Sequence, residues 1–79
     1  MQYAVLKQSG VTFAVVVVKE HVIRSTFEAQ RTQAALEVEF GMPVGLWGDR
    51  NQNVYGRPDI VRFLQRLHVS QIPWRRRVA

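Results

Sequence analysis

The 79-residue sequence contains no cysteine, which excludes disulfide bonds and thiolate metal sites. Its two histidines lack the spacing of a metal-binding motif, so we expect neither a metal nor a cofactor. The longest apolar run, Phe13–Val18, is far shorter than the roughly 20 residues that span a bilayer. The N-terminus also lacks the basic-then-apolar layout of a signal peptide. We therefore expect a soluble, cytoplasmic protein without a membrane partner.

The chain is short, and residues 1–79 should form one small α+β domain. A domain of this size buries roughly 60–65% of its unfolded surface and is stable by only a few kcal/mol. Such domains are usually reinforced by disulfides, a metal or a second subunit. Because cysteines and a metal-binding motif are missing, self-association is the remaining reinforcement. A composition of 47% hydrophobic and 22% charged residues is typical of a folded chain.

The net charge lies entirely in the last third of the chain, and it comes from arginine. Residues 1–48 hold four basic and four acidic side chains, whereas residues 49–79 hold seven arginines and two aspartates, which accounts for the whole formal charge of +5. Guanidinium groups suit phosphate or carboxylate partners, and the alternative is a solvated helix face and tail. The candidate contacts for an anion or a nucleic acid are Arg57, Arg62, Arg66, Arg75, Arg76 and Arg77.

Two apolar segments near the N-terminus predict a β-hairpin. Tyr3–Lys7 and Thr12–Val18 are separated by a short Gln-Ser-Gly stretch, and the second segment is rich in β-branched residues that favour strands. The valines at positions 15–18 do not alternate with polar residues, so both faces of this strand should be buried. The strand therefore belongs in the middle of a sheet.

A helix is predicted over residues 26–40. Ser25 and Glu28 have the spacing of a capping box, and Gly41 can end the helix in the left-handed conformation. Residues 36–40 also alternate with period two, so a strand is the competing interpretation there. The apolar residues occupy two nearly opposite faces, which implies that the helix is covered on two sides. One face holds Phe27, Ala34 and Val38, and the other holds Ala29, Leu36 and Phe40.

The second half of the chain repeats the order strand, strand, helix. Pro43–Trp47 and Val54–Tyr55 are predicted strands joined by a polar turn, and a second helix opens at residues 56–59 with proline in its first turn. This helix is amphipathic, with Arg62 and Arg66 opposite its apolar face. Residues 72–79 form a Trp/Arg tail that packs on the domain or trails from it.

The element order ββαββα predicts a mixed four-stranded sheet with two helices packed on one face, in two layers. The first helix should connect two parallel strands, and the strand order should be 1-2-3-4. The other sheet face then needs the tail or a second copy to cover it, and the two-faced helix makes the same demand. We therefore predict a homodimer. The candidate interface or anchor residues are Val15, Val17, Leu36, Phe40 and Trp74.

Residues 42–47, the polar turn, residues 54–56 and the helix from Pro58 resemble the closing ββα unit of thioredoxin-like proteins. In that family a cis-proline begins the first of these strands, the position that Pro43 occupies in this sequence. The likeness covers about a third of the chain. The paired cysteines of the family are missing, and only one helix is expected between strands two and three. The resemblance therefore implies a shared supersecondary shape and no redox activity.

No catalytic constellation stands out, so we expect that the protein is not an enzyme. His21 is interpreted as a polar strand-end residue and His68 as a C-terminal cap of the second helix. The Gly45-x-x-Gly48 pattern lacks the Lys-Ser/Thr of a phosphate loop. Arg57 either holds an anion together with the free amides of the helix start or pairs with Asp59.

Two functions from different classes remain. The first is a small homodimeric protein-interaction module or accessory protein, whose apolar surface meets another protein. The alternative, which is less favoured, is a nucleic-acid-binding module that uses the arginine stripe, with Trp74 stacking on bases. The alternative requires the arginines of the helix and the tail to share one continuous surface, and an extended tail aligns at most two of its three arginines.

Overall fold

A tight hairpin opens the fold. In the computed structural model, which describes residues 1–77, β1 (Gln2–Gln8) and β2 (Val11–Val18) form an antiparallel pair. The two turn residues Ser9 and Gly10 both have positive φ angles, 52° and 79°. This combination is typical of two-residue hairpin turns, because its twist matches the twist of the flanking strands. The predicted hairpin is confirmed.

Three further strands extend the hairpin into a mixed sheet. β3 (Val44–Gly48) runs parallel to β2, β4 (Val54–Tyr55) pairs antiparallel with β3, and β5 (Arg75–Arg76) pairs antiparallel with β1. The order β4-β3-β2-β1-β5 confirms the predicted neighbours of the first four strands and the parallel crossover. It adds a fifth strand that the sequence analysis did not predict.

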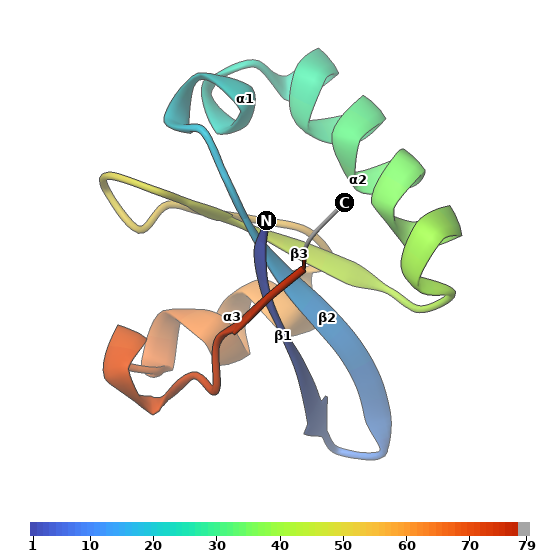
Figure 1. Cartoon of the computed structure of the whole chain (residues 1–79), viewed down its shortest axis with the longest axis vertical. Coiled ribbons are helices and arrows are strands. Elements are labelled where there is room, and N and C mark those ends of the chain that lie inside the picture. Colours follow the sequence, from blue (N-terminus) through green and yellow to red (C-terminus); the bar gives the residue numbers. More distant parts are fainter. Residues whose placement is uncertain (78–79) are drawn as a thin grey trace.

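The helices cover both faces of the sheet, so the predicted two-layer arrangement is wrong (Figure 1). α1 (Glu20–Arg24) and α2 (Thr26–Phe40) lie on one face, and α3 (Pro58–Arg66) lies on the other. The short α1 was also not predicted. None of the helices within residues 1–77 combines the length and the apolar character that crossing a bilayer requires.

The valine-rich strand β2 alternates between two cores. Phe13 and Val15 belong to the core under α3, whereas Ala14 and Val16 belong to the core under α2. This strand is therefore buried on both faces, as its run of valines predicts. However, helices of the same chain provide the cover, so this strand does not require a second copy.

Local signals set both ends of α2, but only one of the two hydrogen bonds of the predicted capping box is present in the described residues. The Ser25 hydroxyl accepts a hydrogen bond from the Glu28 N–H (3.3 Å), and Gly41, with φ of 69°, donates its N–H to the Glu37 carbonyl (2.9 Å). Residues 36–40 are helical, which confirms the helix over the competing strand. The Glu37 carboxylate also accepts the Val44 N–H (3.1 Å) and thereby links α2 to the start of β3.

His68 begins a 3₁₀ helix, Val69–Gln71, instead of capping the end of α3. Its Nδ1 accepts the Ser70 N–H (3.2 Å), and its own N–H donates to the Gln71 side chain (2.8 Å). The predicted C-terminal cap is therefore wrong, because the chain has already left the helical conformation at Leu67.

The tail is packed onto the domain as far as residue 77. Ile72 is buried, and Trp74 is half-buried against Trp47, with the two rings edge to face and their centroids 6.0 Å apart. β5 then pairs with the beginning of β1. Residues 78–79 of the predicted tail lie outside the described residues. All peptide bonds within residues 1–77 are trans, so Pro43 departs from the thioredoxin-like pattern.

Candidate functional site

The glycines at 45 and 48 allow close packing on the two faces of β3. A Cβ at Gly45 would lie 3.0 Å from Cγ2 of Ile60 and 3.2 Å from Cδ1 of Leu64, so α3 packs directly on the strand backbone. On the other face, the Glu20 carboxylate of α1 occupies the space of a Cβ at Gly48. The Gly45-x-x-Gly48 pattern therefore serves packing.

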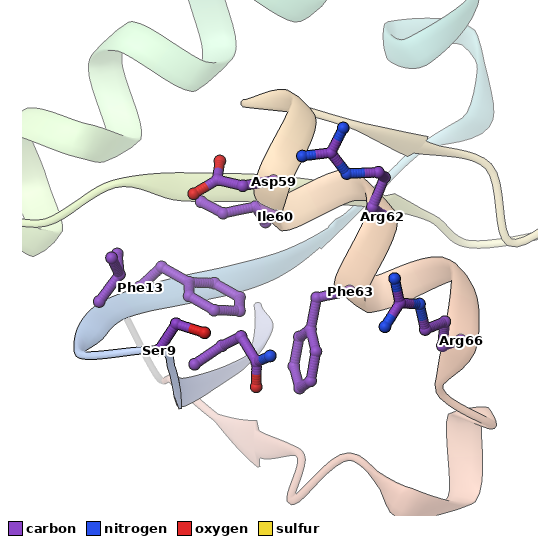
Figure 2. Close-up of a pocket in the computed structure, with 9 residues that line it drawn as sticks. Ser9, Phe13, Asp59, Ile60, Arg62, Phe63 and Arg66 are labelled. Atoms are coloured by element: carbon purple, nitrogen blue, oxygen red, sulfur yellow. The ribbon is translucent and has the colours of Figure 1, made fainter.

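A pocket of about 140 Å³ lies between the β1–β2 hairpin and α3 (Figure 2). Its floor is apolar, because Phe13 of β2 and Phe63 of α3 meet edge to face with their ring centroids 6.0 Å apart, beside Ile60. Phe13 and Ile60 are buried, whereas Phe63 is only half-buried. Part of the Phe63 ring is therefore accessible to a ligand. We call this site the hairpin pocket.

The rim of the hairpin pocket is polar and cationic. Arg62 and Arg66, one turn apart on α3, both line it, and neither forms an ion pair with another residue of the described chain (Figure 2). The hairpin contributes the Gln8 side chain and the Ser9 hydroxyl. The two guanidinium groups are therefore available to a carboxylate or a phosphate.

Asp59 also lines the pocket, but Arg57 neutralises it. Nε and Nη2 of Arg57 donate to the two Asp59 carboxylate oxygens at 3.2 and 2.9 Å. Desolvation opposes ionisation of Asp59, but the hydrogen bonds from Arg57 and the Ile60 N–H outweigh it and lower the pKa of this carboxyl. The predicted pairing of Arg57 with Asp59 is present, so the Arg57 guanidinium is already bound by a carboxylate of the same chain.

The tail arginines are divided between the two faces of the sheet. Arg75 lies opposite Tyr3 and Arg76 opposite Gln2. Directly opposed residues project to the same face, so Arg75 follows Tyr3 to the α2 side, and Arg76 projects to the α3 side. Arg77 lies on the α2 side as well, 5.1 Å from the ring centroid of Phe40.

Arg77 also has a carboxylate partner, because its Nη1 lies 3.5 Å from Oε1 of Glu39. Of the six arginines singled out in the sequence, only Arg62 and Arg66 line the hairpin pocket. The structure therefore does not bring the six together in one continuous stripe.

Two of the five predicted interface residues are inside the monomer, and the other three are partly accessible. Val15 and Leu36 belong to its two cores, which leaves neither available to a partner; Val17, Phe40 and Trp74 are half-buried. The exposed large apolar residues of α2 are instead Phe27 and Val38, with 67% and 85% of their surface accessible.

The hairpin side of the pocket was missed by the sequence analysis. Gln8 and Ser9 were assigned only to the short stretch between the first two strands, and Phe13 carried no functional signal. The only local indication was the pair Arg62 and Arg66 on one helix face. Within residues 1–77, no three His, Asp or Glu side chains converge on a point suited to a metal ion.

Comparisons with known proteins give no match. This holds for a scan against protein-family models, for a search of curated proteins and for a search of solved structures. The function is therefore argued from the geometry and chemistry of the chain.

Proposed function

We propose that the protein is a non-enzymatic interaction module that binds an acidic, partly apolar segment of another protein. The observation that carries this proposal is the pair of unpaired guanidinium groups, Arg62 and Arg66, above the Phe13–Phe63 floor. An apolar side chain suits the floor, and flanking carboxylates suit the guanidinium groups. Arg57 balances the charge of the pocket's own carboxyl, Asp59, so the two remaining guanidinium groups keep the rim positive toward an acidic ligand.

The outer edge of β1 supports a protein partner. Pairing with β5 ends at Tyr3, so the edge from Ala4 to Gln8 has no strand partner within the described chain. An extended peptide can add to such an edge through main-chain hydrogen bonds. Gln8 ends this strand and lines the hairpin pocket, so a peptide paired here would reach the rim of the pocket. Lys7 adds a positive charge along the same edge.

The nucleic-acid alternative has weaker support. Only two of the six arginines share the hairpin pocket, and two phosphate contacts give a salt slope of only about −2 with duplex DNA. Dedicated nucleic-acid surfaces concentrate more positive charge on one face.

Self-association remains part of the proposal, through the outer face of α2. Phe27, Arg31, Ala34 and Val38 follow one another at spacings of four, three and four residues, and the Arg31 guanidinium lies 5.6 Å from the Phe27 ring centroid. The order of these spacings is the same when the helix is read from either end. Two antiparallel copies of α2 would therefore place Phe27 of each copy against Val38 of the other, with the small Ala34 permitting close approach.

A peptide-binding measurement tests the proposed function. The probe is a fluorescein-labelled peptide in which Leu or Phe alternates with Glu, and fluorescence anisotropy reports its binding. We expect saturable binding that weakens about tenfold or more in the double variant Arg62→Gln/Arg66→Gln, because each guanidinium forms charge-assisted hydrogen bonds. The matched control is Arg75→Gln, an exposed arginine on the opposite side of the sheet, which should bind as the natural chain does.

Two results would contradict the proposal. Equal weakening by the double variant and by Arg75→Gln would show that only net charge matters. Tighter binding of a single-stranded oligonucleotide, lost in the same double variant, would favour the nucleic-acid alternative.

A further inference from the structure

The chain diverges at the carboxyl ends of the parallel strands β2 and β3. From β2 it continues into α1 and α2 on one face, and from β3 it continues through β4 into α3 on the other face (Figure 1). The turn of residues 49–53 reverses the chain after β3, so the carboxyl ends of β2 and β3 border a surface crevice that is lined by α1, this turn and the tail. Asp49, directly after β3, donates its N–H to the Val18 carbonyl at the end of β2 (3.0 Å), and hollows flank this point.

The first hollow is cationic. It has a volume of about 240 Å³, and its basic lining residues are Lys19, His21, Arg24 and Arg50. His21 was expected at a strand end; it lies instead on α1, exposed and beside this hollow. Lys19 lies 3.8 Å from Asp49, whereas Arg24 and Arg50 form no ion pair within residues 1–77. Two permanent positive charges therefore line the hollow, and Arg24 also attracts the Glu20 carboxylate and helps to lower its pKa.

The two carboxylates of this hollow are held by internal donors. The Asn53 side chain (2.7 Å) and the Asn51 N–H (3.2 Å) donate to Glu20, and these hydrogen bonds lower the pKa of its carboxyl. Oδ1 of Asp49 accepts the Glu20 N–H (3.1 Å). Both carboxylates therefore stabilise the fold of the crevice, and part of their negative charge is already balanced.

The second hollow is aromatic. It has a volume of about 290 Å³ and contains both tryptophans of the chain, Trp47 and Trp74, together with the side chains of Gln2 and Gln52. Trp74 is half-buried, so its ring offers a stacking surface, and glutamine amides suit the polar edge of a planar ring. Arg50 lines both hollows and links them.

We propose that this crevice binds a nucleoside phosphate, with the base stacked on Trp74 and the phosphate bound by Arg24 and Arg50. The ligand needs both a base and a phosphate. The aromatic hollow offers an anion no strong partner other than Arg50, and the cationic hollow offers a base no stacking surface. The site is separate from the hairpin pocket and shares no lining residue with it.

Intrinsic tryptophan fluorescence tests this site directly, because both tryptophans line it. The probe is ADP, with adenosine and inorganic pyrophosphate as the two partial ligands, and indole N–H signals in an NMR spectrum provide a second readout. We expect a saturable change with ADP at concentrations where neither partial ligand saturates. Arg50→Gln and Arg24→Gln should each weaken ADP binding about tenfold, as expected for loss of a charged hydrogen bond.

The matched control is Arg62→Gln, which lies in the hairpin pocket and should leave ADP binding unchanged. Gln52→Ala provides a second test that preserves both the tryptophans and the arginines, and it should weaken ADP binding without affecting pyrophosphate. The proposal is overturned if ADP binds no better than pyrophosphate, or if Arg62→Gln weakens binding as much as Arg50→Gln. It is also overturned if the indole signals do not move.

Discussion

Substitution of Gly45 by alanine should destabilise the protein although alanine is favoured over glycine in a strand. The new Cβ would lie 3.0 Å from Cγ2 of Ile60 and 3.2 Å from Cδ1 of Leu64, both closer than ordinary van der Waals contacts. Ile60 is β-branched and in a helix, where its χ1 angle is nearly fixed, so this methyl group cannot rotate away. The helix α3 must therefore shift as a unit.

The expected magnitude follows from two opposing effects. Overpacking a core costs about 1–3 kcal/mol, whereas replacing glycine lowers the entropy of the unfolded chain and returns about 0.5–1 kcal/mol. With the middle of each range, the net loss is about 1 kcal/mol, and each kcal/mol should lower Tm by roughly 4–8 °C in a domain of this size. Thermal and urea unfolding followed by circular dichroism measure both quantities.

A double-mutant cycle identifies the contact responsible. Ile60→Leu removes the Cγ2 methyl while conserving side-chain volume, so Gly45→Ala should cost at least about 0.5 kcal/mol less in that background. Because α3 carries Arg62 and Arg66, Gly45→Ala should also weaken binding of the acidic peptide. A Gly45→Ala variant as stable as the natural chain, or a cycle with zero coupling, would refute the packing argument.

Three further predictions concern the rest of the domain. The pKa of the Glu20 carboxyl is lower in the folded chain than the value of about 4.5 expected in the unfolded chain. Glu20 therefore stabilises the fold above about pH 4.5, and this stabilisation is lost as the pH falls toward the folded pKa. The free energy of unfolding in urea should vary less with pH in this range for Glu20→Gln than for the natural chain. Phe27→Glu/Val38→Glu should abolish the dimer in sedimentation while circular dichroism shows a folded chain, and a persistent dimer would place self-association elsewhere. Ile72→Ala should lower the free energy of unfolding by about 2–4 kcal/mol, because Ile72 is buried. Trp74→Leu should lower it by only about 1 kcal/mol, because Trp74 is half-buried. The reverse order of these two losses would make Trp74 the anchor of the tail.

Short-range patterns in the sequence were sufficient for most of the elements. The Ser9-Gly10 turn, the Ser25 cap and Gly41 act within a few residues of their own positions, and each appears in the structure as predicted. The mixed α+β sheet and the parallel pairing of β2 with β3 follow from element order, since a helical crossover connects the two strands. Helical periodicity also placed Arg62 and Arg66 on one face of α3, and these two residues form the cationic side of the hairpin pocket.

Tertiary contacts decided what these patterns left open. β5 has only two residues and exists because β1 offers an unpaired edge, and α1 is too short to show a periodic pattern. The side on which α3 lies depends on its close packing at Gly45, a contact between segments that no local pattern connects. The hairpin pocket needs Phe13 and the hairpin turn beside α3, although these are far apart in sequence. Local interactions determined the elements, and long-range packing determined which faces and side chains meet.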